Sequence, residues 1–508
     1  MRIKITDEQF SRKQAIVHIL ILLGVAFCVG TYLISTMALI SKDGANFIKY
    51  AKDLDTSPVA TMKRNYQHPG YPFLIATTHK IVEMMGGSSR VLNWIYSAQA
   101  TALIFRLLAV VMLYFLGEKI VGQRSSFWAV LTLIFLPNAA KYGSDALSDW
   151  PHIFFLSAGF LLLIYGATNR KWWVFGFSGA VSGTGYLIRP ECAQVVVLGT
   201  LWLGMQVFCP KRIMSRGKAV LAFVLLAAGF FATAGPYMQL KGKFFPKKQL
   251  VEFTTNRPSP EIYKQEAVTD SNDIYSAGFS PSDIASAFGK LAQRISEMLM
   301  WFFVPALLIG IYKHFRRRDW REPKKFFVIA LIVLNVLLMT LLYCKFGYMS
   351  RRHTLPLVVF TIFYIPLGLD VLALWLSEKL SHNKTDMDFW FLVLLVIGVS
   401  ICCFKVLRME EQSQRDTAYR NAARWLAQNT NEEDIIAVPD SRIGLYSGRR
   451  SIQYEGKTIP QKAQYVVKVL EDEKDMPSGE ENLRVKEIFS IEKKSRKSKV
   501  IIYKQGRF

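Results

Sequence analysis

The chain has 508 residues, of which 51% are hydrophobic and 13% aromatic, and its mean hydropathy is +0.20. This composition is too apolar for an ordinary soluble enzyme, and the charged residues, 20% of the chain, gather between apolar runs as they do in membrane proteins. The net charge of +24 comes without an arginine-rich helix or an RNA-binding signature. We therefore expect the basic residues to meet lipid headgroups or phosphates, and no nucleic acid.

Eleven apolar runs are each long enough to cross the hydrocarbon core of a bilayer, which is about 30 Å thick. The first run is too long for the apolar part of a signal peptide, so it is interpreted as a retained span. The expected spans are residues 14–40, 92–117, 125–142, 150–168, 172–189, 193–209, 218–238, 296–313, 325–344, 354–378 and 388–406. The division of residues 172–209 into two spans has the weakest support.

Short basic segments predict the orientation of these spans. Residues 2–13, 211–218 and 314–325 are rich in Lys and Arg and fall on one side of the membrane, which should be the cytoplasmic side. The long loops 41–91 and 239–295 then face outward, and an odd number of spans places the C-terminus outside as well. We expect a multi-pass protein of the cell membrane, of bacterial type, with its site and its C-terminal domain on the outer face.

The sequence becomes typical of a soluble domain from residue 407 onward. An amphipathic helix, a short strand, a further helical or extended piece and a closing strand are expected at residues 416–429, 435–438, 443–446 and 500–503. This alternation predicts a small α/β domain. The chain is thus divided into a transmembrane domain, 1–406, and a soluble domain, 407–508.

The first outer loop holds a candidate catalytic base. Asp43 follows the first span directly, where a carboxylate meets both water and the low dielectric of the membrane edge and can act as a general base. Phe47 and Tyr50 follow at helical spacing and predict an amphipathic helix in the interface, and the turn His68–Pro72 precedes a second such helix. The alternative role of Asp43 is that of a helix N-cap.

Two further acidic residues open the fourth span on the same face. Asp145 and Asp149 are four residues apart, and hence on one side of a helix. Acidic residues at a helix N-terminus also complement the helix dipole, which is the structural alternative. Because Asp43, Asp145 and Asp149 all reach the outer face by topology, their convergence favours a functional site.

Basic residues reach that face from two other connections. Arg189, at the end of the fifth span, needs an anionic partner, and Glu191 is available for this role. Lys345, Arg351 and Arg352 lie between the ninth and tenth spans, where such cations can clamp a phosphate. For each of them singly, snorkelling to lipid headgroups is the alternative.

The order of these motifs resembles the GT-C class of polytopic glycosyltransferases, in particular the bacterial relatives of protein O-mannosyltransferases and aminoarabinose transferases. The motifs are the Asp after the first span, an HPxYPxL turn, S-D-x-L-x-D-x-P before the fourth span, R-P-E after the fifth and R-x-x-L-P at a late span. The C-terminal AARWLAQNT…IIAVPDSRIGLYSGRR also resembles the outer soluble domain common in that class.

The resemblance implies an inverting transfer of a sugar from a polyprenyl-phosphate carrier to a protein, lipid or glycan acceptor at the outer face. It implies that Asp43 and Asp145 are catalytic. The residues grouped with the donor phosphate or substrate are His68, Tyr71, Asp149, Arg189, Glu191, Lys345, Arg351 and Arg352. The chain departs from many relatives, which have Asp-Glu at Asp43-Gly44 and an acidic residue at Gln67.

No metal or cofactor is expected for this reaction, although a divalent cation remains compatible with it. The basic cluster can neutralise a lipid phosphate, no G-x-G-x-x-G or Walker sequence is present, and the six cysteines form no CxxC. A transporter, a flippase or a non-catalytic binder of lipid-linked sugars is the alternative function. Transporters place ionisable residues along a pathway, whereas the middles of these spans hold few besides Arg106 and Asp370.

Overall fold

The computed structural model describes residues 12–86, 91–210, 212–242, 280–316, 322–380, 387–409, 414–454, 459–470, 483–493 and 496–505. Most of the predicted outer loop 239–295, and parts of the basic segments 2–13, 211–218 and 314–325, lie outside these ranges.

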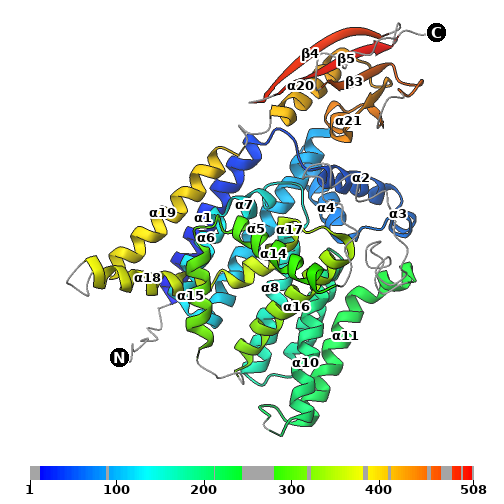
Figure 1. Cartoon of the computed structure of the whole chain (residues 1–508). Helices are drawn as coiled ribbons and strands as arrows, with labels where there is room; N and C mark the ends of the chain where they lie inside the picture. Colours follow the sequence, from blue (N-terminus) through cyan, green and yellow to red (C-terminus); the bar gives the residue numbers. More distant parts are fainter. Residues whose placement is uncertain are drawn as a thin grey trace.

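The described chain is mainly helical, with a small sheet at its C-terminal end, as Figure 1 shows. Helices of the membrane part are α1 (Arg12–Thr36), α5 (Val91–Val121), α6 (Gln123–Phe135), α7 (Pro137–Tyr142), α8 (Asp149–Thr168), α9 (Val174–Tyr186), α10 (Gln194–Phe208), α11 (Arg216–Lys241), α15 (Val304–Phe315), α16 (Pro323–Phe346), α17 (Arg351–Thr361), α18 (Tyr364–Leu380) and α19 (Met387–Leu407). A 3-10 turn, η1 (Pro190–Ala193), precedes α10. The predicted helical membrane protein is confirmed.

Within the described residues, seven helices are long and apolar enough to cross a membrane, or eight if α17 and α18, bent by 64°, form one broken span. The count of eleven stays a prediction, because several expected spans are short or interrupted. Pro137, which lacks an amide hydrogen, separates α6 from α7. Met300 and Trp301 adopt left-handed φ angles of 56° and 61° between α14 (Pro281–Met298) and α15.

The short helices pack closely against longer neighbours. Gly310 of α15 lies so near the carbonyl of Tyr364 in α18 that a Cβ would approach its oxygen to 1.8 Å. Gly183 of α9 would in the same way bring a Cβ to 2.5 Å from the carbonyl oxygen of Phe230 in α11. Small residues at such contacts let helix backbones approach, which is how helices associate in lipid.

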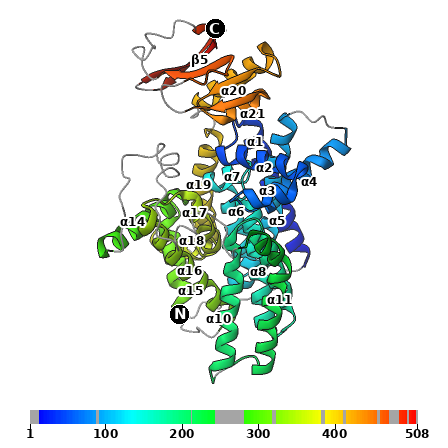
Figure 2. The same cartoon turned by 90° about the vertical axis from the view of Figure 1, so that its right-hand side faces the viewer.

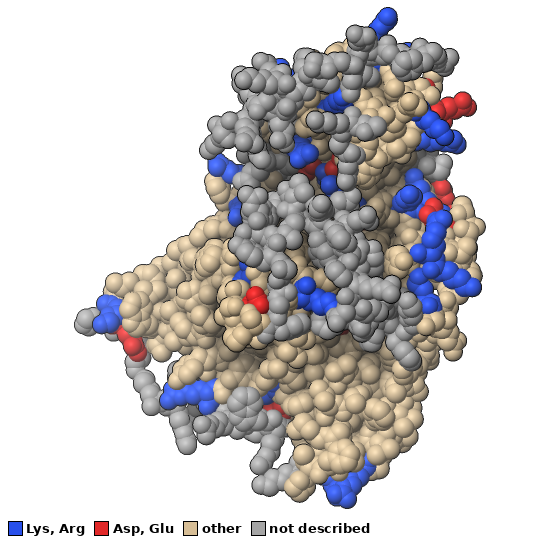
Figure 3. All heavy atoms as spheres, turned by 45° about the vertical axis from the view of Figure 1, so that its right-hand side comes forward, with Lys and Arg blue, Asp and Glu red and all other residues tan. Residues whose placement is uncertain are grey.

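The surface of the membrane part carries few charges between its two ends. Figure 3 shows Lys and Arg at the lower end and near the junction with the C-terminal sheet, while the surface between is mostly uncharged. Large apolar side chains such as Leu201 and Phe231 are exposed there, by 54% and 49%. Such a surface is unfavourable in water and is expected in hydrocarbon.

The first loop forms three short helices at one end of the bundle, α2 (Lys42–Thr56), α3 (Pro58–Arg64) and α4 (Gly70–Met84). The turn before α4 docks on the end of α9, where the amide of Gly70 donates to the carbonyl of Leu187 at 2.7 Å. A Cβ at Gly70 would come within 2.7 Å of the same residue, so glycine is required for this approach. Figure 2 shows these helices on the side of the sheet, opposite the α10–α11 connection.

The C-terminal part has a five-stranded sheet in the order β2-β1-β3-β5-β4. Its elements are α20 (Gln414–Asn429), β1 (Ile435–Val438), α21 (Ser441–Ser447), β2 (Arg450–Gln453), β3 (Tyr465–Leu470), β4 (Leu483–Lys493) and β5 (Arg496–Gln505). Strand β1 is parallel to β2 and β3, whereas β5 is antiparallel to β3 and β4. The segment expected at 443–446 is helical, as part of α21, and the predicted α/β character is confirmed.

Candidate active site

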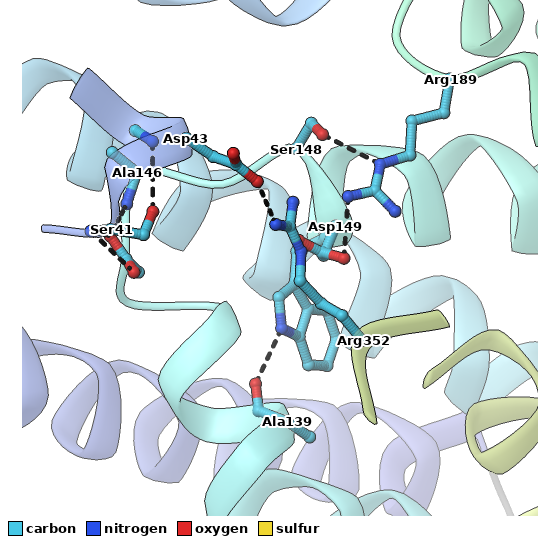
Figure 4. A network of polar contacts seen from close by, with 11 residues as sticks. Ser41, Asp43, Ala139, Ala146, Ser148, Asp149, Arg189 and Arg352 are labelled. Carbon is cyan, nitrogen blue, oxygen red and sulfur yellow. Dashed lines mark hydrogen bonds and ion pairs between the residues drawn. The ribbon is translucent and has the colours of Figure 1, made fainter. Parts of the chain in front are cut away.

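Four of the predicted residues meet where helices of the membrane part begin, as Figure 4 shows. Asp43 lies in the first turn of α2, and Asp149 is the first residue of α8. Arg352 lies in the first turn of α17, and Arg189 directly precedes η1. Elements from the first, middle and last thirds of the chain therefore build one site.

The four residues form an alternating chain of acids and bases. Arg352 donates through one terminal nitrogen to Asp43 Oδ2 and through Nε to Asp149 Oδ2, the latter at 2.8 Å. Arg189 approaches the other oxygen of Asp149 at 2.9 Å and donates through Nε to Ser148 Oγ at 2.9 Å. Charge-assisted bonds of this kind offset the cost of burying Asp149.

Exposure rises from Asp149 through Arg352 to Asp43, and Arg189, on the other side of Asp149, is also mostly buried. The side chain of Asp149 is 1% exposed, that of Arg189 15%, that of Arg352 23% and that of Asp43 38%. A molecule arriving from solvent therefore meets Asp43 first. Asp149 is buried and holds both arginines of the network.

The capping role considered for Asp43 belongs to Ser41. The hydroxyl of Ser41 accepts a hydrogen bond from the amide of Gly44 at 3.1 Å and caps α2. The carboxylate of Asp43 is therefore not needed for the cap, although its place in the first turn is favourable for the helix dipole.

Asp145 lies beside this network but points into the backbone. Its Oδ1 accepts from the amides of Ser41 at 2.9 Å and Ala146 at 2.7 Å, and the side chain is buried. Burial raises the pKa of Asp145, and the two amide hydrogen bonds oppose this shift only in part. The geometry favours a positioning role for Asp145, and its predicted catalytic role stays a prediction.

The structure gives a physical reason for Gly44, the residue at which the chain departs from the pattern of the family it resembles. Gly44 packs against the loop before α8, where a Cβ would lie 2.8 Å from the Cβ of Ala146. Glutamate at this position would push α2 away from that loop. The close approach of α2 to the loop therefore requires glycine after Asp43.

The remaining predicted residues lie around the network. His68 is buried between the rings of Tyr186 and Tyr237, at centroid distances of 5.0 and 5.4 Å. Tyr71 is buried and donates to the carbonyl of Ala98 at 3.2 Å, which ties α4 to α5.

Glu191 and Lys345 lie close in the sequence to the two arginines of the site. Glu191 is in η1, two residues after Arg189. The anionic partner of Arg189 is Asp149 instead of the expected Glu191. Lys345 lies in the last turn of α16, and a short connection leads from there to α17, which carries Arg352.

The structure separates the two adjacent arginines that the sequence left equivalent. Arg352 turns toward Asp43, while Arg351 is 43% exposed and approaches Glu297 of α14 at 3.6 Å. Arg294, also on α14, bonds Glu297 at 3.0 Å and donates to the carbonyl of Met349 at 3.0 Å. Sequence reasoning missed Glu297, Ser41 and Ser148; only Ser148, inside the S-D-x-L-x-D motif, had a signal.

Among the residues that the structure describes, no three His, Cys, Asp or Glu side chains gather in a way that could hold a metal ion. The carboxylates of Asp43 and Asp149 are bridged by the guanidinium of Arg352.

Known proteins resemble this chain in sequence over one segment and in fold over nearly all of it. Residues 67–234 match the sequence model of the family described as dolichyl-phosphate-mannose-protein mannosyltransferase. A comparison with curated proteins gives no match.

Solved structures cover far more of the chain. ArnT from Cupriavidus metallidurans, bound to undecaprenyl phosphate, is 12% identical, with a TM-score of 0.57 over 97% of this chain and 98% of its own. The Archaeoglobus fulgidus oligosaccharyltransferase in the apo form is 11% identical, with a TM-score of 0.54 over 87% of this chain. This chain spans 65% of that protein's length.

The oligosaccharyltransferase AglB from Archaeoglobus fulgidus, in complex with an inhibitory peptide and a dolichol-phosphate, is 11% identical, with a TM-score of 0.53 over 90% of this chain and 70% of its own. The predicted resemblance to GT-C class membrane glycosyltransferases is confirmed by these matches together.

Proposed function

We propose that this protein is an inverting glycosyltransferase that moves a sugar from a polyprenyl-phosphate carrier to an acceptor at the outer face of the cytoplasmic membrane. The observation that carries the proposal is the pair of Asp43 and Arg352, a carboxylate and a cation at the rim of the bundle. The acceptor is a protein, a lipid or a glycan with a nucleophilic group to deprotonate.

The position of the site suits a donor that cannot leave the bilayer. The polyprenyl tail stays in hydrocarbon, so its phosphate reaches no farther than the membrane edge. Three helices begin at the site, and the positive ends of their dipoles favour an anion there. The ArnT structure with undecaprenyl phosphate and the AglB structure with a dolichol-phosphate support a lipid phosphate of this class.

The chemistry needs one base and one cation. Asp43 accepts the proton of the acceptor as the acceptor atom bonds to the anomeric carbon. The bond from that carbon to the phosphate oxygen breaks on the opposite face, which inverts the configuration. The leaving phosphate takes the electron pair, and Arg352 stabilises the charge that develops on it.

Arg352 links these two roles. Without donor, its guanidinium neutralises Asp43 and Asp149. When a phosphate takes one face of the guanidinium, the bond to Asp43 weakens and frees that carboxylate to accept a proton. Asp149 keeps Arg352 in place during this exchange, because its own charge is also held by Arg189.

Arg106, which lies inside the span α5, gives no support to the transporter alternative. Arg106 is fully buried in α5, donates to the carbonyl of Ile134 at 2.9 Å and lies over the ring of Trp150 at 5.6 Å. That carbonyl belongs to the last turn of α6, which Pro137 prevents from continuing. Arg106 thus stabilises a helix break, a structural role, instead of lining a transport path.

The test is a transfer assay with purified protein in lipid nanodiscs and a panel of polyprenyl-phosphate sugars, read by release of polyprenyl phosphate. We expect Asp43→Asn to lower the rate by about 10²- to 10⁴-fold, the range of general-base catalysis, and to leave donor binding intact. Asp53→Asn is the matched control, because Asp53 lies on the same helix and pairs with Arg64 at the surface. Equal rates for Asp43→Asn and the wild type would refute the assigned base.

A further inference from the structure

The C-terminal domain contacts the chain segment that leads into the catalytic base. Helix α1 ends at Thr36 and α2 begins at Lys42, so residues 37–41 connect the first span to Asp43. Figure 1 shows α21 beside α2 at the junction of the two parts. The position of Asp43 therefore depends on the groups that contact residues 37–41.

Neighbouring side chains of the connection enter two different cores. Leu39 is 5% exposed and packs with Tyr419 and Ile443 inside the C-terminal domain. Ile40 is fully buried and packs with Ile48 and Ile75 of the helices α2 and α4. The connection is therefore fixed between the soluble and the membrane parts.

Helix α21 satisfies both backbone groups of Ile40. The amide of Ile40 donates to the hydroxyl of Tyr446 at 3.0 Å, and its carbonyl accepts from a terminal nitrogen of Arg442 at 3.2 Å. The next amide, that of Ser41, donates to Asp145. Asp43 follows two residues after Ser41, so these bonds hold the backbone just before the base.

The two side chains that hold Ile40 are themselves fixed. Arg442 bonds both oxygens of Asp440, at 3.0 and 2.9 Å, and approaches Asp416 at 3.1 Å. Burial alone would raise the pKa of Asp440, but the hydrogen bonds and charge of Arg442 lower it below its ordinary value. The ring of Tyr446 lies under the guanidinium of Arg420, 4.1 Å from the ring centroid.

The hydroxyl of Tyr446 keeps its proton at any working pH, because burial raises the pKa of Tyr446 to about 12. A neutral hydroxyl can accept the Ile40 amide. The contact therefore persists across the pH range in which a carboxylate base changes its charge.

We propose that the C-terminal domain is a clamp on residues 39–43, and that Tyr446 and Arg442 are positioning residues for the base Asp43. The clamp itself stands on the contacts above, whereas its effect on catalysis rests on the proposed function. A displacement of about 1 Å at a reacting group can lower a rate by about 100-fold, so the hold on Ile40 bears on turnover.

Hydrogen–deuterium exchange on the full-length protein in nanodiscs tests the clamp without any substrate. Tyr446→Phe keeps the ring under Arg420 and removes only the acceptor for the Ile40 amide. We expect the peptide covering residues 37–45 to exchange at least about fivefold faster in this variant, since the lost bond contributes about 1 kcal/mol. Tyr454→Phe is the control, because its hydroxyl donates to the carbonyl of Val467 at 2.8 Å inside the C-terminal domain.

Steady-state transfer tests the catalytic consequence. We expect Tyr446→Phe to lower kcat about tenfold and to change the KM for donor less than twofold, with a melting temperature equal to that of Tyr454→Phe. Arg442→Lys keeps a charge beside Asp440 but loses the fork that also reaches Ile40, so it should lower kcat and leave the KM unchanged. Tyr454→Phe should keep the kcat of the wild type.

The outcomes separate the clamp from the proposed function. Unchanged exchange of residues 37–45 in Tyr446→Phe overturns the clamp, whatever the protein catalyses. Faster exchange with an unchanged kcat overturns the positioning role. Absence of transfer by the wild type with every donor overturns the proposed function and, with it, the catalytic consequence, while the exchange result still decides the clamp.

Discussion

Arg352 and Asp43 form an ion pair although 309 positions separate them in the sequence. The pair joins the first loop of the chain to the start of a late helix, so the carboxylate and the cation of the proposed chemistry come from remote parts of the sequence. Arg351, the neighbouring residue, turns to Glu297 instead.

The two adjacent arginines should therefore differ sharply when each is replaced by glutamine. Arg352→Gln leaves Asp43 and Asp149 without their shared partner and removes the cation that we propose for the donor phosphate. We expect the KM for donor to rise by about 10- to 100-fold, from the loss of a charge-assisted contact of about 1.5–3 kcal/mol. Initial rates across a range of donor concentrations measure this change.

Arg351→Gln is the control for this prediction, because it loses only a partly exposed contact at 3.6 Å to Glu297. Such surface pairs contribute little, so the KM should stay within about twofold of the wild type. If the two variants behave alike, Arg352 does not bind the donor phosphate.

Asp145 should tolerate asparagine but not alanine. The shorter hydrogen bonds from Ser41 and Ala146 both end on Oδ1, which an asparagine carbonyl can replace. We expect Asp145→Asn to keep turnover within about tenfold. Asp145→Ala leaves two buried amides without this acceptor, at a cost of about 1–3 kcal/mol each, and should lower the melting temperature strongly.

The same residue predicts a pH dependence of stability. Burial raises the pKa of Asp145 in the folded protein, so its contribution to stability is full below the unfolded pKa and is lost as the pH rises through the folded pKa. The melting temperature of the wild type, relative to that of Asp145→Asn, should therefore fall as the pH rises above the ordinary pKa of an aspartate. A folded but inactive Asp145→Asn would instead make Asp145 catalytic.

The sequence could predict which residues lie on the same face of the membrane part when each of them stands at the end of a span. Asp43, Asp149, Arg189 and Arg352 each lie at such an end, and topology alone places them on one face. The pattern could not choose between Arg351 and Arg352, because consecutive helical residues point about 100° apart and the choice depends on Glu297 of a distant helix.

Contacts between remote segments could not be predicted. Nothing near Ile40 in the sequence indicates that Tyr446 accepts its amide, since the two residues are 406 positions apart. The interrupted spans were missed for a different reason. Hydropathy averages over a window, so the break at Pro137 disappears into the apolar run from 125 to 142.

Transfer should persist after removal of divalent metals. Arg352 lies between Asp43 and Asp149 and neutralises both, so a cation could bind these carboxylates only by displacing the guanidinium. We expect rates within about twofold after dialysis against EDTA, measured with and without added Mg²⁺ or Mn²⁺. Loss of activity in EDTA that one of these cations restores would show that the reaction uses a metal.

Labelling with a membrane-impermeant maleimide should place the site on the outer face. Tyr66, between α3 and α4, is 61% exposed on the side of the site, whereas the exposed Cys209 lies at the basic α10–α11 connection. In intact cells we expect Tyr66→Cys to be labelled and Cys209 to be protected, because Arg212 and Arg216 favour the cytoplasmic side. The parent protein, which keeps Cys209, controls for background, and permeabilised cells should label both positions. Labelling of Cys209 alone in intact cells would put Asp43 and Arg352 on the cytoplasmic face and rule out transfer on the outer one.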